Sequence, residues 1–185
     1  MIEYAKVDVN DAVKLEAEFV LEHIDHWTVD KDHVRVGVVV YHDTVSEVIH
    51  VDQYQDDVAA LKTRIMRIAR GLNPSGEADL AGAFDYVREF SFTGARPGAA
   101  RVVIPFINNM PAAKTSLDTI VESANKLKQT CVSIIAFGVH HEHTQPSSIN
   151  YDTVKQLVSK PVKGHFEVFD TFYDLATYYI GIKCR

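Results

Sequence analysis

The densest set of metal-binding side chains in this sequence is the run His140, His141, Glu142 and His143. Imidazole nitrogens are good ligands for Zn²⁺ and Cu²⁺, so the run could support a metal-assisted hydrolase. Adjacent residues in a loop seldom converge on one ion, and the sequence shows no partner that would orient the imidazoles. We therefore interpret the run as an exposed polar loop and expect no bound metal.

A second pair, His42 and Asp43, has the residue types of a catalytic acid and base. No G-x-S-x-G nucleophile motif accompanies the pair, and no glycine-rich phosphate-binding loop follows any expected strand. Asp43 is also explained as a turn residue, because aspartate side chains stabilise tight turns. The sequence therefore predicts a protein that is not an enzyme and needs no cofactor.

The elements that would position these residues alternate between strand and helix patterns. Strands are predicted at 1–9 (weakly), 34–41, 45–51, 101–107, 132–139 and 166–169. Helices are predicted at 11–27, 56–69, 79–90, 115–129, 151–159 and 172–182. This alternation is typical of an α/β fold with a mostly parallel sheet and helices on both faces.

Two details of the strand pattern predict departures from a regular parallel sheet. The link at residues 42–44 is so short that the strands on either side of it are expected to form an antiparallel hairpin. Pro105 interrupts the strand at 101–107 and has no amide hydrogen for pairing, so a bulge or a local loss of pairing is expected there.

Composition limits the function further. A chain of 185 residues with 46% hydrophobic residues fits one folded domain spanning residues 1–185. The net charge of −6 and the absence of a basic run argue against a nucleic-acid surface. No apolar stretch approaches the roughly 18 residues of a membrane helix, and residues 1–4 lack a signal-peptide pattern.

Five phrases, taken in order, resemble the von Willebrand factor A family, the fold of integrin inserted domains, matrilins and collagen VI. They are VRVGVVVYHD at 34–43, GEADLAGAFDYV at 76–87, RPGAARVVI at 96–104, LKQTCVSIIAFGV at 127–139 and FEVFDTF at 166–172. The resemblance covers about residues 11–182. It implies a three-layer, Rossmann-like α/β fold whose mostly parallel central sheet has one antiparallel edge strand.

The family's metal-ion-dependent adhesion site is only partly matched by this sequence. In the family, D-x-S-x-S after the first strand, a threonine before the third helix and an aspartate after the fourth strand supply oxygen ligands, which Mg²⁺ prefers. Here the threonine position reads Ala78, which offers no side-chain oxygen, and the aspartate position reads Asn108, which brings no charge.

Three alternatives remain open for the D-x-S-x-S motif. An alignment without a gap begins the motif at Glu3 and leaves almost no room for a first strand. A short deletion places Asp8, Asn10 and Ala12 there, and we prefer this alignment because the first strand is central in the family's sheet. The third alternative is that the chain begins inside the domain. In each case fewer than two strong anionic ligands remain, so the resemblance implies a degenerate site without metal.

The resemblance also implies a function. We expect a non-enzymatic, metal-independent protein-binding module of a secreted extracellular-matrix or adhesion protein, within a larger chain, with collagen or another matrix protein as partner and neither nucleic acid nor membrane. The residues expected to line its binding rim are Asp8, Asn10, Asp79, Asn108, Asn109, His140, His141 and His143. A purely structural spacer module and an intracellular assembly scaffold are the alternatives.

The two cysteines, Cys131 and Cys184, leave two arrangements open. They are either two free thiols, with Cys131 buried, or one disulfide, which requires Cα atoms within about 7 Å. The resemblance places both cysteines at the bottom of the sheet, where such a bond is geometrically allowed. Cys184 alternatively pairs outside this domain.

Overall fold

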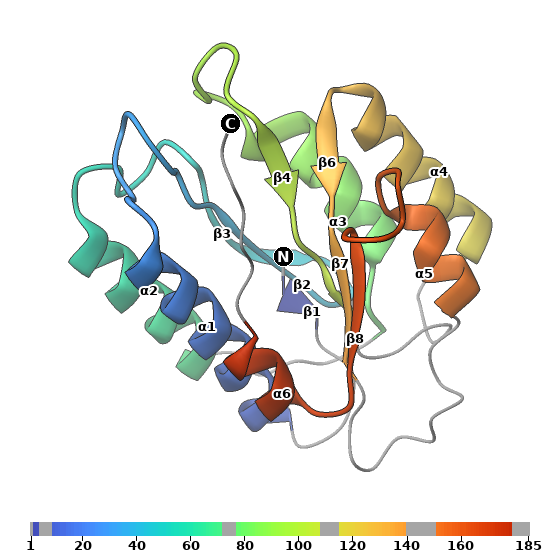
Figure 1. Cartoon of the computed structure of the whole chain (residues 1–185), viewed down its shortest axis with the longest axis horizontal. Helices are drawn as coiled ribbons and strands as arrows, with labels where there is room; N and C mark the ends of the chain where they lie inside the picture. The colour runs from blue at the N-terminus through green and yellow to red at the C-terminus, as the bar shows by residue number, and fades with distance from the viewer. Residues whose placement is uncertain (1, 4–8, 72–76, 108–114, 140–150, 179–185) are drawn as a thin grey trace.

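Short apolar strands form the centre of the molecule. Every residue of β2 (Val38–Tyr41) and β7 (Ala136–Val139) is buried, as is typical of strands covered on both faces. The computed structural model describes residues 2–3, 9–71, 77–107, 115–139 and 151–178. In this part of the chain, helices flank the sheet on both sides, which gives three layers (Figure 1).

The sheet is mostly parallel. β1 (Ile2–Glu3) pairs in parallel with β2, and β2 pairs antiparallel with β3 (Val45–Ile49). On the other side, β5 (Phe106–Ile107) pairs in parallel with β7, and β7 with β8 (Phe166–Phe169). Because β1 contacts β5, the two sets of strands continue each other. The expected α/β fold, with one antiparallel edge strand and a hairpin after residue 41, is confirmed.

The interruption at Pro105 is also confirmed. Before it, β4 (Arg101–Val103) pairs with β6 (Val132–Ile134), and after it β5 pairs with β7. Between these two pairings, the Ile135 amide donates to the Val103 carbonyl at 3.0 Å, and the Phe137 amide donates to the Pro105 carbonyl at 3.0 Å. Proline can accept but not donate in the ladder, so the strand pair is split at this position.

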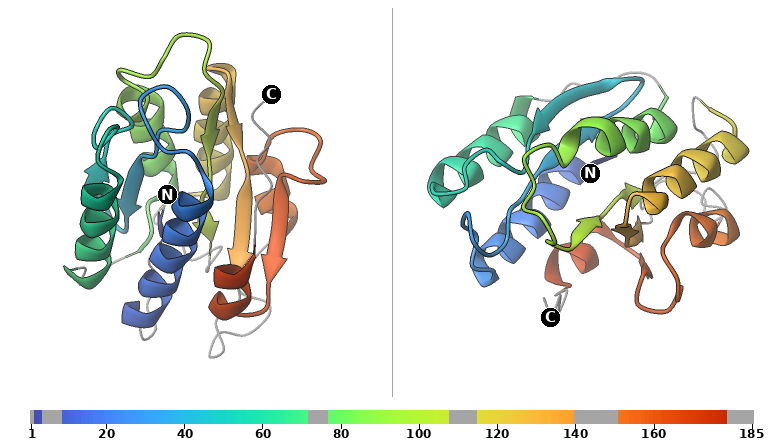
Figure 2. Two further views of the ribbon diagram at one scale, coloured as in Figure 1. Left: turned by 60° about the vertical axis from the view of Figure 1, so that its left-hand side comes forward. Right: turned by 90° about the horizontal axis from the view of Figure 1, so that it is seen from above.

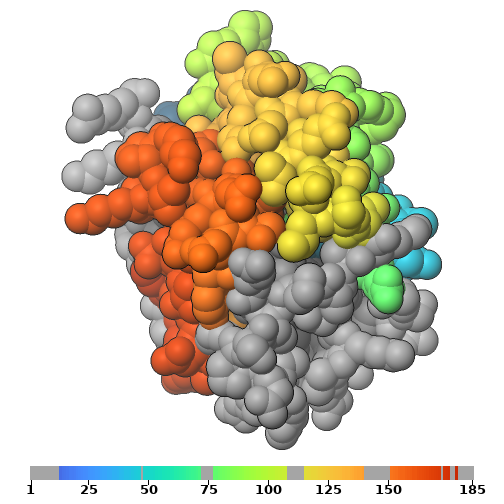
Figure 3. Space-filling view, turned by 90° about the vertical axis from the view of Figure 1, so that its right-hand side faces the viewer, coloured from blue at the N-terminus to red at the C-terminus, as the bar shows by residue number. Residues whose placement is uncertain are grey.

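The helices divide into two groups, one on each face of the sheet (Figure 2). One face carries α1 (Val9–His26), α2 (Val58–Gly71) and α6 (Phe172–Thr177), and α1 packs against both of the others. The opposite face carries α3 (Leu80–Tyr86), α4 (Leu117–Gln129) and α5 (Tyr151–Leu157). The contact between α4 and α5 is visible at the surface in Figure 3. No helix in the described ranges is long and apolar enough to cross a membrane.

Each face has its own core. Under α1 and α6 the core is aromatic, and Phe137 makes edge contacts with Phe19 and Phe169 at ring-centroid distances of 5.6 and 5.5 Å. Under α3, α4 and α5 the core is mainly aliphatic, with fully buried Ile120 and Leu127. Each such side chain contributes roughly 1.5–3 kcal/mol by leaving water, so the two cores hold the helices against the sheet.

Several element boundaries differ from the expectations. The strand expected at 34–41 is regular only over Val38–Tyr41, because Val34 forms an isolated bridge with Val29 and its amide donates to the Thr28 carbonyl. The helix expected at 79–90 ends at Tyr86 and continues as the π-helix η1 (Val87–Ser91). The last helix ends at Thr177, because Tyr178 has extended backbone angles.

Polar side chains cap two of the helices, α4 and α2. Ser116 caps α4, since its hydroxyl accepts from the Thr119 amide at 3.3 Å. The helix expected at 56–69 begins at Val58, so α2 contains no acid in its first turn. Asp57 instead accepts from the Ala60 amide at 2.8 Å, so its charge stabilises the helix as a cap.

Candidate functional site

The candidate site lies where the carboxyl ends of the parallel strands meet, which is where α/β sheets usually bind ligands. The described residues at this end include His42 and Asp43, which follow β2, and Ala78 and Asp79, which precede α3. The Asp79 amide donates to the His42 carbonyl, which joins the two segments. The start of α3 is thereby fixed against the end of β2.

Asp79 caps α3. Its side chain accepts from the Gly82 amide at 2.8 Å, and the close approach of its carboxylate leaves no room for a Cβ at Gly82. This hydrogen bond satisfies one of the amides that every helix leaves unpaired at its start. The structure therefore gives Asp79, which was expected on a binding rim, a capping role.

Ala78 belongs to the core. Its side chain is 3% exposed and packs in the aliphatic cluster that also contains Tyr41 and Leu80. A methyl group has no lone pair for a cation, so position 78 supplies no ligand where the resembling family has threonine. The residues described at this position do not fit a bound Mg²⁺.

His42 and Asp43 pair with each other at the tip of the β2–β3 hairpin. The His42 ring and the Asp43 carboxylate form an ion pair, and the His42 amide donates to the Thr44 carbonyl at 3.1 Å. Such contacts stabilise a tight turn, so Asp43 has the turn role considered from the sequence. Among the residues that the structure describes, no three His, Cys, Asp or Glu side chains gather into a metal-binding group.

Most of the predicted rim falls outside the part of the chain that the structure describes. Asp8, Asn108, Asn109, His140, His141, His143 and Cys184 all lie outside the described residues. The backbone of Asn10 lies in the first turn of α1, and its side chain is not described. The binding roles of these residues and the Cys131–Cys184 disulfide stay predictions.

Cys131 differs from its expected environment. It was expected to be buried as a free thiol, but the structure shows it exposed, in the turn between α4 and β6. Its φ of +61° lies in the left-handed region, and its amide donates to the Lys128 carbonyl at 3.1 Å. The expected burial is therefore wrong, because Cys131 lies in the tight reversal between helix and strand and not within the buried strand that follows.

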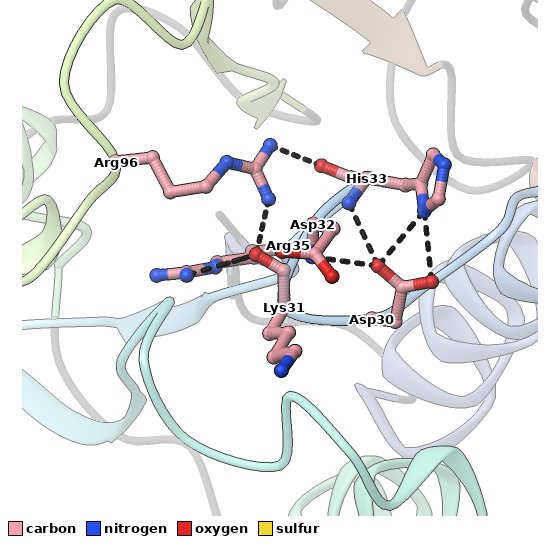
Figure 4. A network of polar contacts seen from close by, with 6 residues as sticks. All are labelled: Asp30, Lys31, Asp32, His33, Arg35 and Arg96. Carbon is pink, nitrogen blue, oxygen red and sulfur yellow. Dashed lines mark hydrogen bonds and ion pairs between the residues drawn. The ribbon is translucent and has the colours of Figure 1, made fainter.

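At the opposite end of the sheet, two arginines hold two loops together (Figure 4). Arg96 donates to the carbonyls of Lys31 and His33, and Arg35 donates to the carbonyls of Lys31 and Gly94. Of these five bonds between charged donors and backbone carbonyls, three cross between the lead-in to β2 and the turn at 93–98 and fix the two loops against each other. Charge-assisted bonds of this kind are among the stronger hydrogen bonds in proteins.

Asp30 organises the same loop. Its carboxylate accepts from the amides of Asp32 and His33, both at 2.7 Å, and pairs with the His33 ring at 2.8 Å. The hydrogen bond from the His33 side chain, followed by that from the Asp32 amide, lowers the pKa of Asp30 below its ordinary value. The charged carboxylate is therefore the form that the folded loop stabilises.

A search of protein families found that the model of the von Willebrand factor type A domain matches residues 8–179. A search of curated proteins found no match. Among solved structures, proximal thread matrix protein 1 from the mussel byssus superposes with a TM-score of 0.74 at 21% identity. That similarity covers 92% of this chain and 41% of the mussel protein, so this chain spans less than half the mussel protein's length.

Two further solved structures show the same fold. The manganese-loaded TRAP protein of Plasmodium vivax has a TM-score of 0.65 at 16% identity, with 87% of this chain and 62% of that protein covered. The pilus adhesin SpaC of Lactobacillus rhamnosus GG has a TM-score of 0.69 at 10% identity, covering 91% of this chain and 27% of the adhesin.

Proposed function

Because this chain belongs to the von Willebrand factor type A family, whose domains are in general non-catalytic binding modules, we propose that it is a metal-independent protein-binding module of an extracellular-matrix or adhesion protein. Its binding surface is the strand-carboxyl end of the sheet, and its partner is collagen or another matrix protein. The partner would dock by surface complementarity, with no chemical step.

The observation that carries metal independence is the buried methyl group of Ala78, which occupies the position where the family uses a threonine ligand. Its neighbour Asp79 holds one carboxylate oxygen on the Gly82 amide at the start of α3, which gives this side chain a role as a helix cap. One solved structure of the mussel protein has a zinc-occupied metal-ion-dependent adhesion site. This chain differs from such a site at position 78, where the alanine side chain is packed into the core.

The proposed matrix setting is supported by the names of two proteins that share this fold. The mussel protein is named as a matrix protein and the Lactobacillus protein as a pilus adhesin. Both are longer than this chain, as their coverage of 41% and 27% shows. We propose that this domain is likewise one module of a longer, secreted chain, where repeated weak contacts would add avidity.

The first experiment is isothermal titration of the full chain with Mg²⁺, Mn²⁺ and then Zn²⁺. We expect no saturable heat with Mg²⁺ or Mn²⁺, and saturable binding of either ion would overturn metal independence. Zn²⁺ binding alone would assign a metal to the histidine run at 140–143 and would contradict the interpretation of that run as a plain polar loop.

The second experiment measures binding of the chain to immobilised collagens and other matrix proteins, with EDTA and with Mg²⁺. We expect equal binding in both buffers and about tenfold weaker binding for the double variant N108A/N109A, since a few residues usually dominate an interface. The control E122A/K126A removes an exposed 2.8 Å ion pair on α4 and should bind normally. A folded chain that binds no matrix protein would favour the spacer alternative.

A further inference from the structure

Helix α2 is unusually basic for a protein of this charge. It carries Lys62, Arg64, Arg67 and Arg70 and no acidic residue between Val58 and Gly71, although the whole chain has a net charge of −6. The helix dipole favours cations only in the last turn, and Arg70 is the basic residue there. The dipole therefore leaves the other three cations unexplained.

Three of these cations border one hollow on the surface. The hollow has a volume of about 600 Å³, is open to solvent, and is lined by Lys62, Thr63, Met66, Arg67, Arg70 and Gly71. The lining positions form adjacent pairs that recur every fourth residue (62 and 63, 66 and 67, 70 and 71), so they make a single stripe along one side of the helix. From Lys62 to Arg70 the stripe extends about 12 Å at the usual rise of a helix.

Most of the positive charge along this stripe is not neutralised. The Lys62 ammonium pairs with Asp25 of α1. Arg67 and Arg70 are exposed, and among the described residues no ion pair involves either of them. Each guanidinium therefore presents its fork of N–H donors to solvent, and this geometry matches the oxygens of a sulfate or carboxylate group.

We propose that this stripe on α2 binds a sulfated polysaccharide chain. An open hollow with cations in a line suits a linear polyanion that enters at one end and leaves at the other. An acidic protein partner would need apolar pockets for anchor residues, and of the lining residues that the structure describes only Met66 has an apolar side chain. Nucleic acid is disfavoured by the acidic net charge of −6, and the described part of the lining offers no aromatic side chain for base stacking.

The test uses the full chain and a heparin oligosaccharide, with binding measured by surface plasmon resonance at salt concentrations of about 0.05 and 0.15 M. We expect saturable binding that weakens with salt, and a loss of at least about tenfold in affinity for R67A/R70A. The control K31A/K163A removes two charges from exposed lysines elsewhere and should stay within about twofold of the unchanged chain.

Four outcomes would overturn the proposal: no binding of heparin at the lower salt, equal losses in R67A/R70A and K31A/K163A, equal binding of desulfated heparin, or equal binding of polyglutamate. The last would indicate an acidic protein partner. R67Q/R70Q keeps long side chains while removing both charges, so it repeats the test if the alanine variant is unstable. N108A/N109A should retain heparin affinity, which separates this site from the proposed protein-binding end of the sheet.

Discussion

The two ends of the sheet use their polar side chains in different ways. At the amino ends of the strands, Arg35 and Arg96 reach across from separate loops and donate to backbone carbonyls. At the carboxyl ends, Asp79 bonds to its own helix and Ala78 is buried in the core. The comparison shows that residues expected near the family's metal site can have structural roles instead. Ala78 has no side-chain oxygen, and one carboxylate oxygen of Asp79 accepts a hydrogen bond from its own helix.

Removing Arg96 should give the largest effect at the amino end. Arg96→Ala deletes two charge-assisted bonds to the carbonyls of Lys31 and His33, so we expect the free energy of unfolding to fall by about 2 kcal/mol. Urea unfolding measures this loss. Arg96→Lys keeps the positive charge but loses the forked guanidinium, so its free energy of unfolding should lie between those of the unchanged chain and Arg96→Ala. An alanine variant as stable as the unchanged chain would show that the loops hold together without Arg96.

At the carboxyl end, Asp79→Ala should cost less. The variant loses the cap that accepts from the Gly82 amide, and such caps contribute about 1 kcal/mol. Asp79→Asn retains the accepting oxygen and should be close to the unchanged chain in thermal unfolding. If Asp79→Ala were stable but lost partner binding, Asp79 would belong to the binding rim predicted from the sequence.

Replacing Cys131 should stabilise the amino end of β6. A side chain at φ +61° is strained by roughly 1–2 kcal/mol, and glycine removes that strain while losing more entropy on folding. We therefore expect Cys131→Gly to raise the free energy of unfolding by about 0.5–1 kcal/mol. Cys131→Ser, which keeps the strained Cβ, is the control, and equal gains in both would indicate that the thiol itself was destabilising.

The smallest expected effect is a pH dependence from His23, in the last turn of α1. The side chain is 1% exposed, and burial lowers its pKa below 6.5, partly opposed by its hydrogen bond to the Phe19 carbonyl. Its contribution to stability is therefore present above pH 6.5 and is lost as the pH falls below that value, because the unfolded chain takes up the proton first.

His23→Phe should flatten the dependence of unfolding free energy on pH below 6.5, measured by urea unfolding at several pH values. The neighbouring charges of Glu22 and His26 remain in this variant. His50→Gln, at a half-buried histidine elsewhere, should keep the original slope. An unchanged slope in His23→Phe would assign the acid sensitivity to another group.

Local patterns predicted the fold well. The valine-rich run before Tyr41 and the apolar run at 132–139 indicated buried strands, because strands covered on both faces consist of nearly continuous apolar residues. The short link at 42–44 forced an antiparallel hairpin, and Pro105 forced a break in the pairing. Each of these features depends on residues that are close together in the sequence, so local patterns are enough to predict it.

The candidate site was less predictable. Ala78 could be identified in the sequence as a missing ligand, but the capping bond of Asp79 depends on where α3 begins. The basic stripe was missed because Lys62, Arg67 and Arg70 are separated by other residues and form no run. A helical projection of residues 58–71 would have placed them on one side, although it could not have shown the hollow beside them.

The sequence by itself determined the α/β class, the order of the elements and the family, because periodicity and short phrases are local properties of the chain. Tertiary structure decided which charges are paired. Lys62 meets Asp25 across two helices, Arg96 reaches a loop far away in sequence, and Arg67 and Arg70 are left facing solvent. The physical reason is that ion pairs and hydrogen bonds act over a few ångströms, and only the packed chain brings distant residues that close.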